Sequence, residues 1–403
     1  MINSALDLRA AIIGTFLAIE LISSSDNSMS AIQTKTSKMP SLTIVTNIPA
    51  PYRMPIYQLL AEKLGYDNFH VIFCSHKEDN REWIVEQNDF AYTFLKKSFI
   101  CWKGRFIHYN PDALKVLRQL NSDVVITTGF NPTHLLAFAY TVFYKKVHIP
   151  KTDGTFESEQ ILSGLHRIVR RIVYRYSKTF LGASQGALRL YNSYGISRDQ
   201  FYQSHLCANN AAFVPLPGVN RPFDLMFSGR FSPEKNPLFA LDVAAGVAKA
   251  LKRKISILML GSGPLLEQAK NYADMLGPEV DATFPGFVQQ ANLPTLYCSA
   301  KLFLFPSSWD PWGVVANEAC AAGQAIIVSP HAGVANELVC DGENGYVLPL
   351  DLELWVKHAV DLLSNEALLE QFSKNSVVKV QPYTYEAAAQ GVIDAVDAAL
   401  ANS

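Results

Sequence analysis

Short apolar runs alternate along the chain with stretches of helical periodicity. Between residues 42 and 184 the runs LTIVTNI, HVIFCS, DVVITTG and TFLGAS are separated by amphipathic segments such as 54–64 and 133–144. Strands that are apolar on both faces are typical of a parallel sheet that helices cover on both sides. The pattern therefore predicts a doubly wound α/β domain over residues 39–221.

A second series of the same kind follows a break. The segment PLPGVNRP, residues 215–222, interrupts the periodicity and predicts a linker. The runs DLMFSGR, ISILMLGSG, ATFPGFV, KLFLFPSS and AIIVSP then predict a second doubly wound domain over residues 222–381. In residues 382–403 a last helix, 385–400, carries apolar side chains on one side and needs a surface to cover. The predicted fold class is α/β, with two Rossmann-like domains facing across a cleft and ligands at the carboxyl ends of the strands.

The first 38 residues differ from the rest. An apolar stretch over residues 10–22 precedes a run rich in Ser and Thr. It is shorter than the roughly 20 residues that a spanning helix needs. We interpret residues 1–38 as an N-terminal extension, either disordered or lying on a membrane surface.

Composition narrows the class of protein. With 49% hydrophobic and 18% charged residues in 403, the chain is globular and long enough for two cores. The six cysteines lie far apart, without a zinc-type spacing, which favours the reducing cytoplasm and argues against structural zinc.

The net charge of -1 hides an asymmetry between the two halves. Residues 39–221 hold 21 Lys and Arg against 13 Asp and Glu (21 - 13 = +8), and residues 222–403 hold 11 against 20 (11 - 20 = -9). A basic half suits a phosphorylated acceptor, an acidic membrane surface or nucleic acid. Solvated charge that only aids solubility is the alternative.

The segment FSGRFSPEKNP combines a glycine with two cations at a strand end. Gly229 lets a ligand approach the backbone closely. Arg230 offers a planar fork and Lys235 a point charge, and together they can neutralise a diphosphate without a metal.

A second glycine turn follows the next strand. Gly261 and Gly263 stand between that strand and a helix, an arrangement in which exposed amides and the helix N-terminus favour an anion. The turn lacks the third glycine of the dinucleotide fingerprint and the Gly-Lys-Ser/Thr of a P-loop. A tight strand-to-helix turn without a ligand is the alternative.

The strongest signal is the segment FPSSWDPWGVVANEACAAGQAIIVSPHAGVANELVCDGENGYV, residues 305–347. A strand leads into a loop that carries Asp310 and Trp312, and Gly313 opens a helix. We place Asp310 against sugar hydroxyls and Trp312 beside the same ligand. A role of Asp310 as an ordinary helix or loop cap is the alternative.

Geometry along that helix matches a nucleotide sugar. The free amides of Gly313, Val314 and Val315 are placed to hold phosphate. Glu318 lies about 7 Å further along the axis, roughly the distance from a diphosphate to the ribose, whose hydroxyls its carboxylate would accept.

Together these motifs resemble the retaining glycosyltransferase family 4 (glycosyltransferases group 1) and its GT-B fold, over nearly all of the chain from Met39. The resemblance implies Arg230 and Lys235 on the donor diphosphate and Glu318 as the second carboxylate of the Glu-x7-Glu segment. It also implies that backbone atoms near Phe287 and Val288, in FPGFV, read the base. Asp310 replaces the first glutamate of the family pattern.

The N-terminal half resembles the family less closely. TNIPAPYRMP is similar to the opening of members that act on polysaccharide or lipid-linked acceptors, which implies that Asn47, Pro51, Tyr52 and Arg53 line the acceptor side.

In HIPKTDGTFESE, Asp153 and Thr155 stand where many relatives carry a histidine. We place Asp153 near the reacting sugar and Thr155 beside it. His148 is interpreted as a structural strand histidine.

One predicted helix is both basic and amphipathic. Its cations stand opposite an aliphatic face and favour an anionic membrane surface, although an ordinary surface helix with its apolar face in the core fits equally well. The cations are Arg167, Arg170, Arg171, Arg175 and Lys178, and the aliphatic residues are Leu165, Ile168, Val169, Ile172 and Val173.

These observations predict a cytoplasmic, metal-independent retaining glycosyltransferase without a cofactor. It would move a sugar from a nucleotide sugar to a glycan or lipid-linked acceptor, with contact to the inner membrane face and no nucleic-acid partner. The resemblance implies that the final helix returns to the N-terminal domain. A sugar-nucleotide epimerase or phosphorylase of the same architecture, or a non-catalytic nucleotide-sugar-binding scaffold, are the alternatives.

Overall fold

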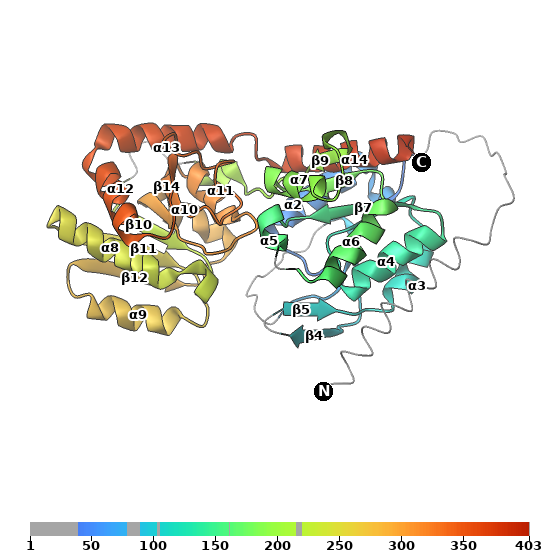
Figure 1. Cartoon of the computed structure of the whole chain (residues 1–403), viewed down its shortest axis with the longest axis horizontal. Helices are drawn as coiled ribbons and strands as arrows, with labels where there is room; N and C mark the ends of the chain where they lie inside the picture. The colour runs from blue at the N-terminus through green and yellow to red at the C-terminus, as the bar shows by residue number, and fades with distance from the viewer. Residues whose placement is uncertain (1–38, 79–88, 103–104, 161, 215–219, 403) are drawn as a thin grey trace, which may run out of the picture.

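The computed structural model describes residues 39–78, 89–102, 105–160, 162–214 and 220–402 (Figure 1). The predicted N-terminal extension, with its apolar stretch over residues 10–22, lies outside these ranges, as does most of the predicted linker.

The first domain contains a seven-stranded sheet in the order β3-β2-β1-β6-β7-β8-β9, and every strand pair in it is parallel. The four apolar runs of this half form β1, β2, β6 and β8, as predicted. The strands are β1 Leu42–Thr46, β2 Phe69–Phe73, β3 Ala91–Phe94, β6 Val124–Thr127, β7 Val147–Thr152, β8 Phe180–Gly182 and β9 Phe201–Gln203. A separate antiparallel hairpin, β4 Phe99–Trp102 and β5 Arg105–His108, was not predicted.

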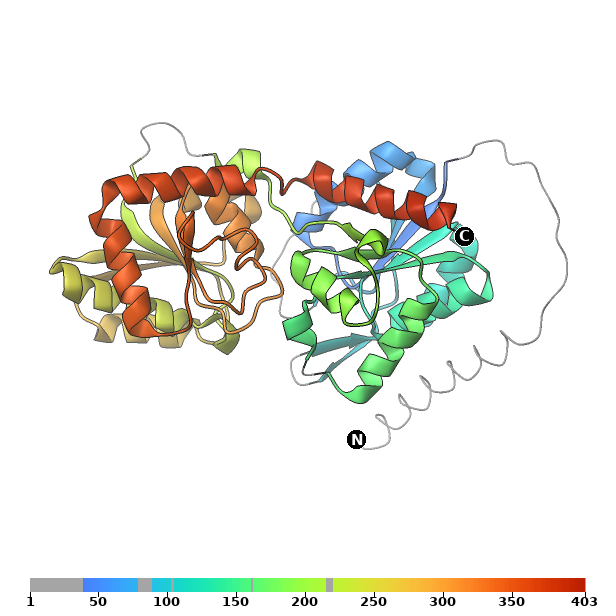
Figure 2. The same cartoon turned by 45° about the horizontal axis from the view of Figure 1, so that its top comes forward.

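The second domain repeats the design with a six-stranded parallel sheet in the order β12-β11-β10-β13-β14-β15. Figure 2 shows the two domains as separate layered bodies. The strands are β10 Phe223–Ser228, β11 Ile255–Leu260, β12 Val280–Gly286, β13 Ala300–Phe305, β14 Ala325–Val328 and β15 Gly345–Val347.

Helices cover both faces of each sheet, because alternate residues of a buried strand pack into different clusters. Ile44 packs with residues of α2 such as Leu60, whereas Val45 packs with Leu117 of α3. The helices are α2 Met54–Leu64, α3 Ala113–Leu120, α4 Pro132–Phe143, α5 Phe156–Glu159, α6 Gly164–Arg175, α7 Gln185–Asn192, α8 Pro237–Leu251, α9 Leu266–Met275, α10 Leu293–Cys298, α11 Val314–Ala321, α12 Leu352–Ser364, α13 Glu366–Val380 and α14 Tyr385–Ala401.

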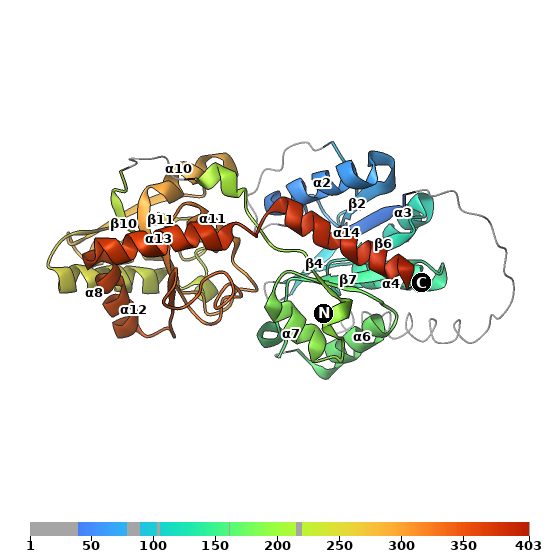
Figure 3. The same cartoon turned by 90° about the horizontal axis from the view of Figure 1, so that it is seen from above.

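The last helix crosses from the second domain to the first, as the resemblance implies. Figure 3 shows α13 on one domain and α14 lying along the other. Gly391 of α14 approaches β9 so closely that a Cβ there would sit 1.8 Å from the carbonyl oxygen of Gln203, which only glycine permits. Thr179 Oγ1 donates to the Ala395 carbonyl at 2.9 Å. The predicted fold class, two Rossmann-like domains with a returning C-terminal helix, is confirmed.

Candidate active site

The candidate donor residues follow neighbouring strands of the second sheet. Because β10, β11, β12 and β13 are parallel and adjacent, the loops after them share one edge, which we call the second carboxyl edge. The loops that follow these strands bring together the following predicted residues: Gly229, Arg230, Lys235, Gly261, Gly263, Phe287, Val288, Asp310 and Gly313.

Backbone packing accounts for the two glycines of the turn after β11. A Cβ on Gly261 would lie 1.9 Å from the Gly229 carbonyl oxygen, and one on Gly263 would lie 2.6 Å from that of Phe231. The Phe231 amide donates to Ser262 at 2.8 Å, so the loops after β10 and β11 are joined directly. Backbone packing thus explains the two glycines without a ligand, as the alternative of a tight strand-to-helix turn requires. The same contact places the turn against the loop that carries Arg230.

Arg230 and Lys235 differ in their partners. The Arg230 side chain is half-buried and forms no hydrogen bond or ion pair with any described residue. Lys235, the last residue of the 3-10 helix Pro233–Lys235, forms an ion pair with Asp310 Oδ2, and its Nζ lies 5.9 Å from the Phe305 ring centroid. The side chains of Lys235 and Asp310 keep 20% and 12% of their surface exposed, so a ligand at this edge can reach both.

The loop around Asp310 is braced by residues 331–333, which follow β14 within the segment 305–347 and for which no role was predicted. The Asp310 amide donates to the His331 carbonyl at 3.2 Å, and the Gly333 amide donates to the Asp310 carbonyl at 2.9 Å. A Cβ on Gly333 would meet the Pro311 carbonyl oxygen at 2.0 Å, so only glycine fits. The backbone of Asp310 is therefore fixed while its side chain faces Lys235.

The helix that follows begins where the sequence predicted. Gly313 is the N-cap of α11 with φ of 101°, a conformation that favours glycine. A Cβ there would also lie 2.3 Å from the Phe305 ring. In the described chain the amides of Gly313, Val314 and Val315 donate to no acceptor, as expected for the first turn of a helix.

Glu318 is buried one turn further along α11. Its Oε1 accepts from Gln290 Nε2 at 3.0 Å, and it is 5% exposed. Burial raises the pKa of Glu318, and the neighbouring Tyr297 and Gln290 offset part of that rise. Glu318 is thus not a solvated side chain, and Gln290 and Tyr297 are neighbours that the sequence did not reveal.

The side chain of Trp312 does not line the edge, contrary to the sequence prediction. It is fully buried, donates from Nε1 to Asn317 Oδ1 at 2.8 Å and packs on Tyr383. The other tryptophan of this loop, Trp309, is 49% exposed. Core packing therefore holds Trp312, and Trp309 is the aromatic side chain that a ligand can contact.

On the first sheet, the acceptor-side candidates follow β1. Asn47 Oδ1 accepts from Asn131 Nδ2 at 2.8 Å, which fixes that side chain. Pro51 begins a 3-10 helix that ends at Arg53, and the guanidinium carbon of Arg53 lies 5.6 Å from the Tyr52 ring centroid.

Arg53 and Asp153 form an ion pair that joins the loop after β1 to the end of β7. Arg53 is 7% exposed, and burial opposes its charge while Asp153 raises the pKa of the guanidinium above its ordinary value overall. Lys151, two residues before Asp153, was missed by the sequence analysis and is also 7% exposed. Its Nζ donates to Ser204 Oγ at 2.7 Å, and burial with the nearby Arg53 lowers its pKa to about 7.

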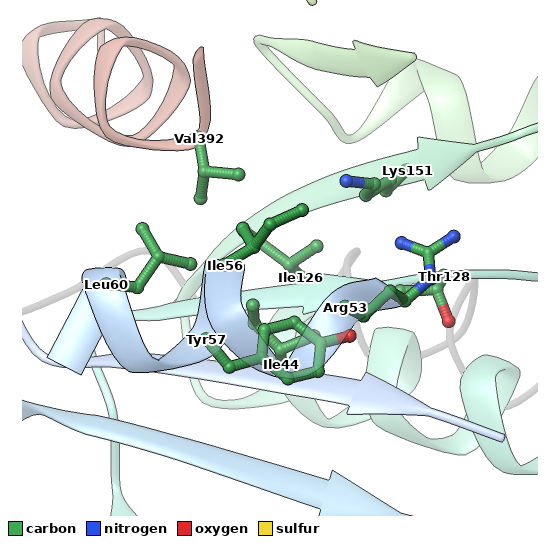
Figure 4. A pocket seen from close by; sticks show the side chains of 9 residues that line it. All are labelled: Ile44, Arg53, Ile56, Tyr57, Leu60, Ile126, Thr128, Lys151 and Val392. Atoms are coloured by element: carbon green, nitrogen blue, oxygen red, sulfur yellow. The ribbon is translucent and has the colours of Figure 1, made fainter. Parts of the chain in front are cut away.

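Figure 4 shows that Lys151 and Arg53 reach the same small cavity from different elements. Aliphatic side chains such as Ile56, Leu60 and Val392 line the rest of that cavity. Two basic side chains thus border an apolar space beside a single carboxylate.

His148 and Thr155 have structural partners. His148 is buried between Thr127 and Ser177, which lie at 3.0 and 2.9 Å from its ring nitrogens, and burial lowers its pKa to about 3. The structural interpretation of His148 is confirmed. Thr155 is the N-cap of α5, where its Oγ1 accepts from the Ser158 amide at 3.2 Å.

The basic helix α6 has a mixed outer face. Arg170 is buried against Glu159, whereas Arg167 and Arg171 are exposed. Leu165 and Ile168, predicted on the aliphatic face, are 42% and 53% exposed, because Val169 and Val173 form the buried stripe together with Arg170 and Tyr174.

No helix in the described ranges is long and apolar enough to span a bilayer. Within the same ranges no group of three His, Cys, Asp or Glu side chains is arranged to hold a metal ion.

The two Rossmann-like domains and the returning C-terminal helix define the GT-B fold. The chain superimposes on the crystal structure of Anabaena Alr3699/HepE in complex with UDP and glucose with a TM-score of 0.71 at 15% identity, covering 89% of this chain and 99% of that one. Residues 214–377 match the family model of glycosyl transferases group 1.

Two curated relatives illustrate the match. Over 137 residues the chain is 30% identical to the mannosylfructose-phosphate synthase of Agrobacterium fabrum, which is 34% of this chain and 28% of that protein. Over 316 residues it is 25% identical to the GalNAc-alpha-(1->4)-GalNAc-alpha-(1->3)-diNAcBac-PP-undecaprenol alpha-1,4-N-acetyl-D-galactosaminyltransferase of Campylobacter jejuni, or 77% of this chain and 82% of that protein. The first curated relatives are matched over only 28%, 30% and 39% of their own lengths.

Proposed function

We propose that the protein is a retaining glycosyltransferase of the hexosyltransferase type. It moves a sugar from a UDP- or GDP-sugar to a glycan or lipid-linked acceptor in polysaccharide or glycoconjugate synthesis. The observation that carries this proposal is the Lys235–Asp310 pair beside the open amides of α11. The group 1 match and the UDP named with the Anabaena structure support it.

When the donor binds, Lys235 and Asp310 separate and each contacts a part of the donor instead. The diphosphate takes the place of Asp310 on Lys235 and contacts the guanidinium of Arg230, which has no partner among the described residues. Asp310, released from Lys235, then accepts hydroxyls of the sugar. Glu318 accepts the ribose hydroxyls from its buried position on α11.

Charge stabilisation drives the chemical step. As the bond from the anomeric carbon to the diphosphate oxygen breaks, negative charge grows on the leaving group, where Arg230, Lys235 and the α11 amides oppose it. These groups supply the charge that a metal ion would otherwise supply. The acceptor oxygen attacks from the face that the diphosphate leaves, and its proton passes to a phosphate oxygen.

The decisive experiment measures donor affinity and transfer together. A thermal-shift screen of UDP-, GDP- and ADP-sugars identifies the donor, since a ligand stabilises the state that binds it. The variant Arg230→Ala/Lys235→Ala should then weaken donor affinity by about 100-fold or more. A control, Lys254→Ala/Lys270→Ala, removes two exposed lysines of the same domain and should leave affinity unchanged. Wild-type affinity and turnover in Arg230→Ala/Lys235→Ala contradict the assignment.

Product analysis separates the alternative activities. Incubation with the nucleotide sugar alone should give only slow hydrolysis, whereas an epimerised nucleotide sugar would indicate an epimerase. Donor binding without turnover on a broad acceptor panel, and no gain from Asp310→Glu, would indicate a scaffold.

We further propose that α6 rests on an anionic membrane. Leu165 and Ile168 are exposed on this helix, and Arg167, Arg171 and Arg175 form no ion pair with a described residue. Such a face binds anionic vesicles through insertion and charge together. Leu165→Ser/Ile168→Ser should abolish sedimentation with phosphatidylglycerol vesicles, whereas Met275→Ser, at an exposed methionine of the second domain, should not. Equal binding by all three proteins contradicts the proposal.

A further inference from the structure

Glu337 connects the two domains directly. It belongs to the second domain and follows β14, yet its Oε2 accepts from the backbone amide of Gln185 at 2.8 Å. Its Oε1 accepts from Gln203 Nε2 at 3.1 Å. Both partners lie in the first domain, at the carboxyl ends of β8 and β9.

The receiving surface is built to hold a carboxylate. Gln185 is the first residue of α7, and a helix N-terminus favours negative charge. Gln185 Nε2 also donates to Gln203 Oε1 at 3.1 Å, which orients the Gln203 amide group toward Glu337. Burial raises the pKa of Glu337, while the bonds to Gln185 and Gln203 and the charge of Arg189 lower it, so the carboxylate is desolvated and its donors offset the cost.

The other end of the same segment braces Asp310. The backbone of residues 331–333 pairs with Asp310 on both sides, at 3.2 Å to the His331 carbonyl and 2.9 Å from the Gly333 amide. Only three residues lie between Gly333 and Glu337, and the Val334 carbonyl accepts from the amides of Glu337 and Leu338 at 3.2 and 3.0 Å. The segment is therefore a compact, hydrogen-bonded turn rather than a slack connection. This turn links Glu337 to the residues that pair with Asp310.

We propose that Glu337 is a positioning residue that fixes the orientation of the two domains and, through residues 331–333, sets Asp310 and Lys235 for the donor sugar. The inference rests on the proposed donor site. Docking of the first domain on Glu337 fixes the position of Asp310 beside the donor sugar, so the acceptor domain controls how the sugar is oriented. Glu337 itself touches no substrate, and its loss should lower kcat while donor affinity stays close to that of the wild type.

The contact offers an exchange experiment. In Glu337→Gln one side-chain donor faces the amide donor of Gln203, and in Gln203→Glu two carboxylates face each other. In the double variant Glu337→Gln/Gln203→Glu, the new amide donates to the new carboxylate and still accepts from the Gln185 amide. Each single change should lower kcat about tenfold, the scale of one charged hydrogen bond, and the double variant should recover to within about threefold of the wild type.

Matched controls and a second readout keep the result decisive. Glu343→Gln alters an exposed glutamate of the same domain, which pairs with Lys379, and should leave kcat unchanged. Small-angle scattering should show a broader distribution of domain separations in each single variant and the wild-type distribution in the double variant. Wild-type kcat and scattering in Glu337→Gln, or a double variant no better than either single one, overturn the inference. If no nucleotide sugar binds the wild-type protein, the proposed function fails, whereas the scattering comparison still decides the role of Glu337.

Discussion

The second carboxyl edge has a counterpart on the first sheet, where the loop after β1 meets the end of β7, and we call it the first edge. The two edges hold their charged side chains in opposite ways. On the second edge Arg230 has no partner among the described residues, and the paired Lys235 and Asp310 stay partly open to solvent. On the first edge Arg53 and Lys151 are each only 7% exposed and are satisfied by Asp153 and Ser204 within the protein.

This difference indicates the role of each set of charged side chains. A charge that is accessible and weakly committed can exchange its partner for a ligand, whereas a buried charge with an internal partner mainly sustains the structure around it. The second edge therefore suits binding of an anionic donor. The first edge is suited to form a rigid surface against which an acceptor lies.

The largest effect is expected at Asp310. Asp310→Asn removes the charge that positions the sugar and holds Lys235, so kcat should fall about 1000-fold, or about 4 kcal/mol in the barrier. The melting temperature should change little because the pair is partly exposed. Steady-state kinetics check this, with Asp281→Asn, an exposed aspartate paired with Lys254, as the control. A kcat within threefold of the wild type contradicts a role for Asp310 in transfer.

The equivalent change on the first edge should act on stability instead. Asp153→Asn leaves the guanidinium of Arg53 buried without a counter-charge, which should lower the free energy of unfolding by about 3 kcal/mol. Urea denaturation measures this loss. The double variant Arg53→Met/Asp153→Asn should regain part of it, because no buried charge then remains unpaired. If Asp153→Asn keeps full stability and loses activity, the two edges are alike and Asp153 acts on the reacting sugar.

Local sequence signals account for most of the fold. The apolar runs became β1, β2, β6 and β8 because a strand buried on both faces needs a continuous apolar stretch. The hairpin β4–β5 and the strand β9 carried no such signal. β9 has three residues and gains its place by pairing with β8 and packing against Gly391 of α14, contacts that are distant in sequence.

The gathering of the donor candidates at one edge was predictable because these residues directly follow strands. Glycines and cations at strand ends can be recognised in the sequence, and parallel strands then place them at one edge of the sheet. The face that a loop residue presents is not local information, which is why Trp312 was placed at the ligand although it packs on Tyr383.

Residues that act across elements were missed for the same reason. Lys151 reads as an exposed strand residue until Ser204 and Arg53 are seen around it. Glu337 reads as an ordinary surface glutamate until Gln185 and Gln203 of the other domain are placed against it.

The smallest expected effect is the pH dependence that Lys151, on the first edge, gives to the free energy of unfolding. Burial and the charge of Arg53 lower the pKa of Lys151 to about 7 in the folded state, against about 10.4 in an unfolded chain. Between these values the unfolded state binds more protons than the folded state, so the contribution of Lys151 to stability rises with pH. The rise amounts to at most about 1.4 kcal/mol per pH unit, and below pH 7 this lysine adds no slope.

The measurement is the unfolding free energy of the wild type minus that of Lys151→Met at pH 6, 7, 8 and 9. This subtraction cancels the contribution of the buried cysteines, which titrate in the opposite sense. The difference should be flat from pH 6 to 7 and then grow in favour of the wild type. Lys270→Met, at an exposed lysine of the second domain, should give no such growth. A flat difference up to pH 9 would mean that Lys151 keeps its proton in the folded protein, and the first edge would then hold two permanent cations, like the second.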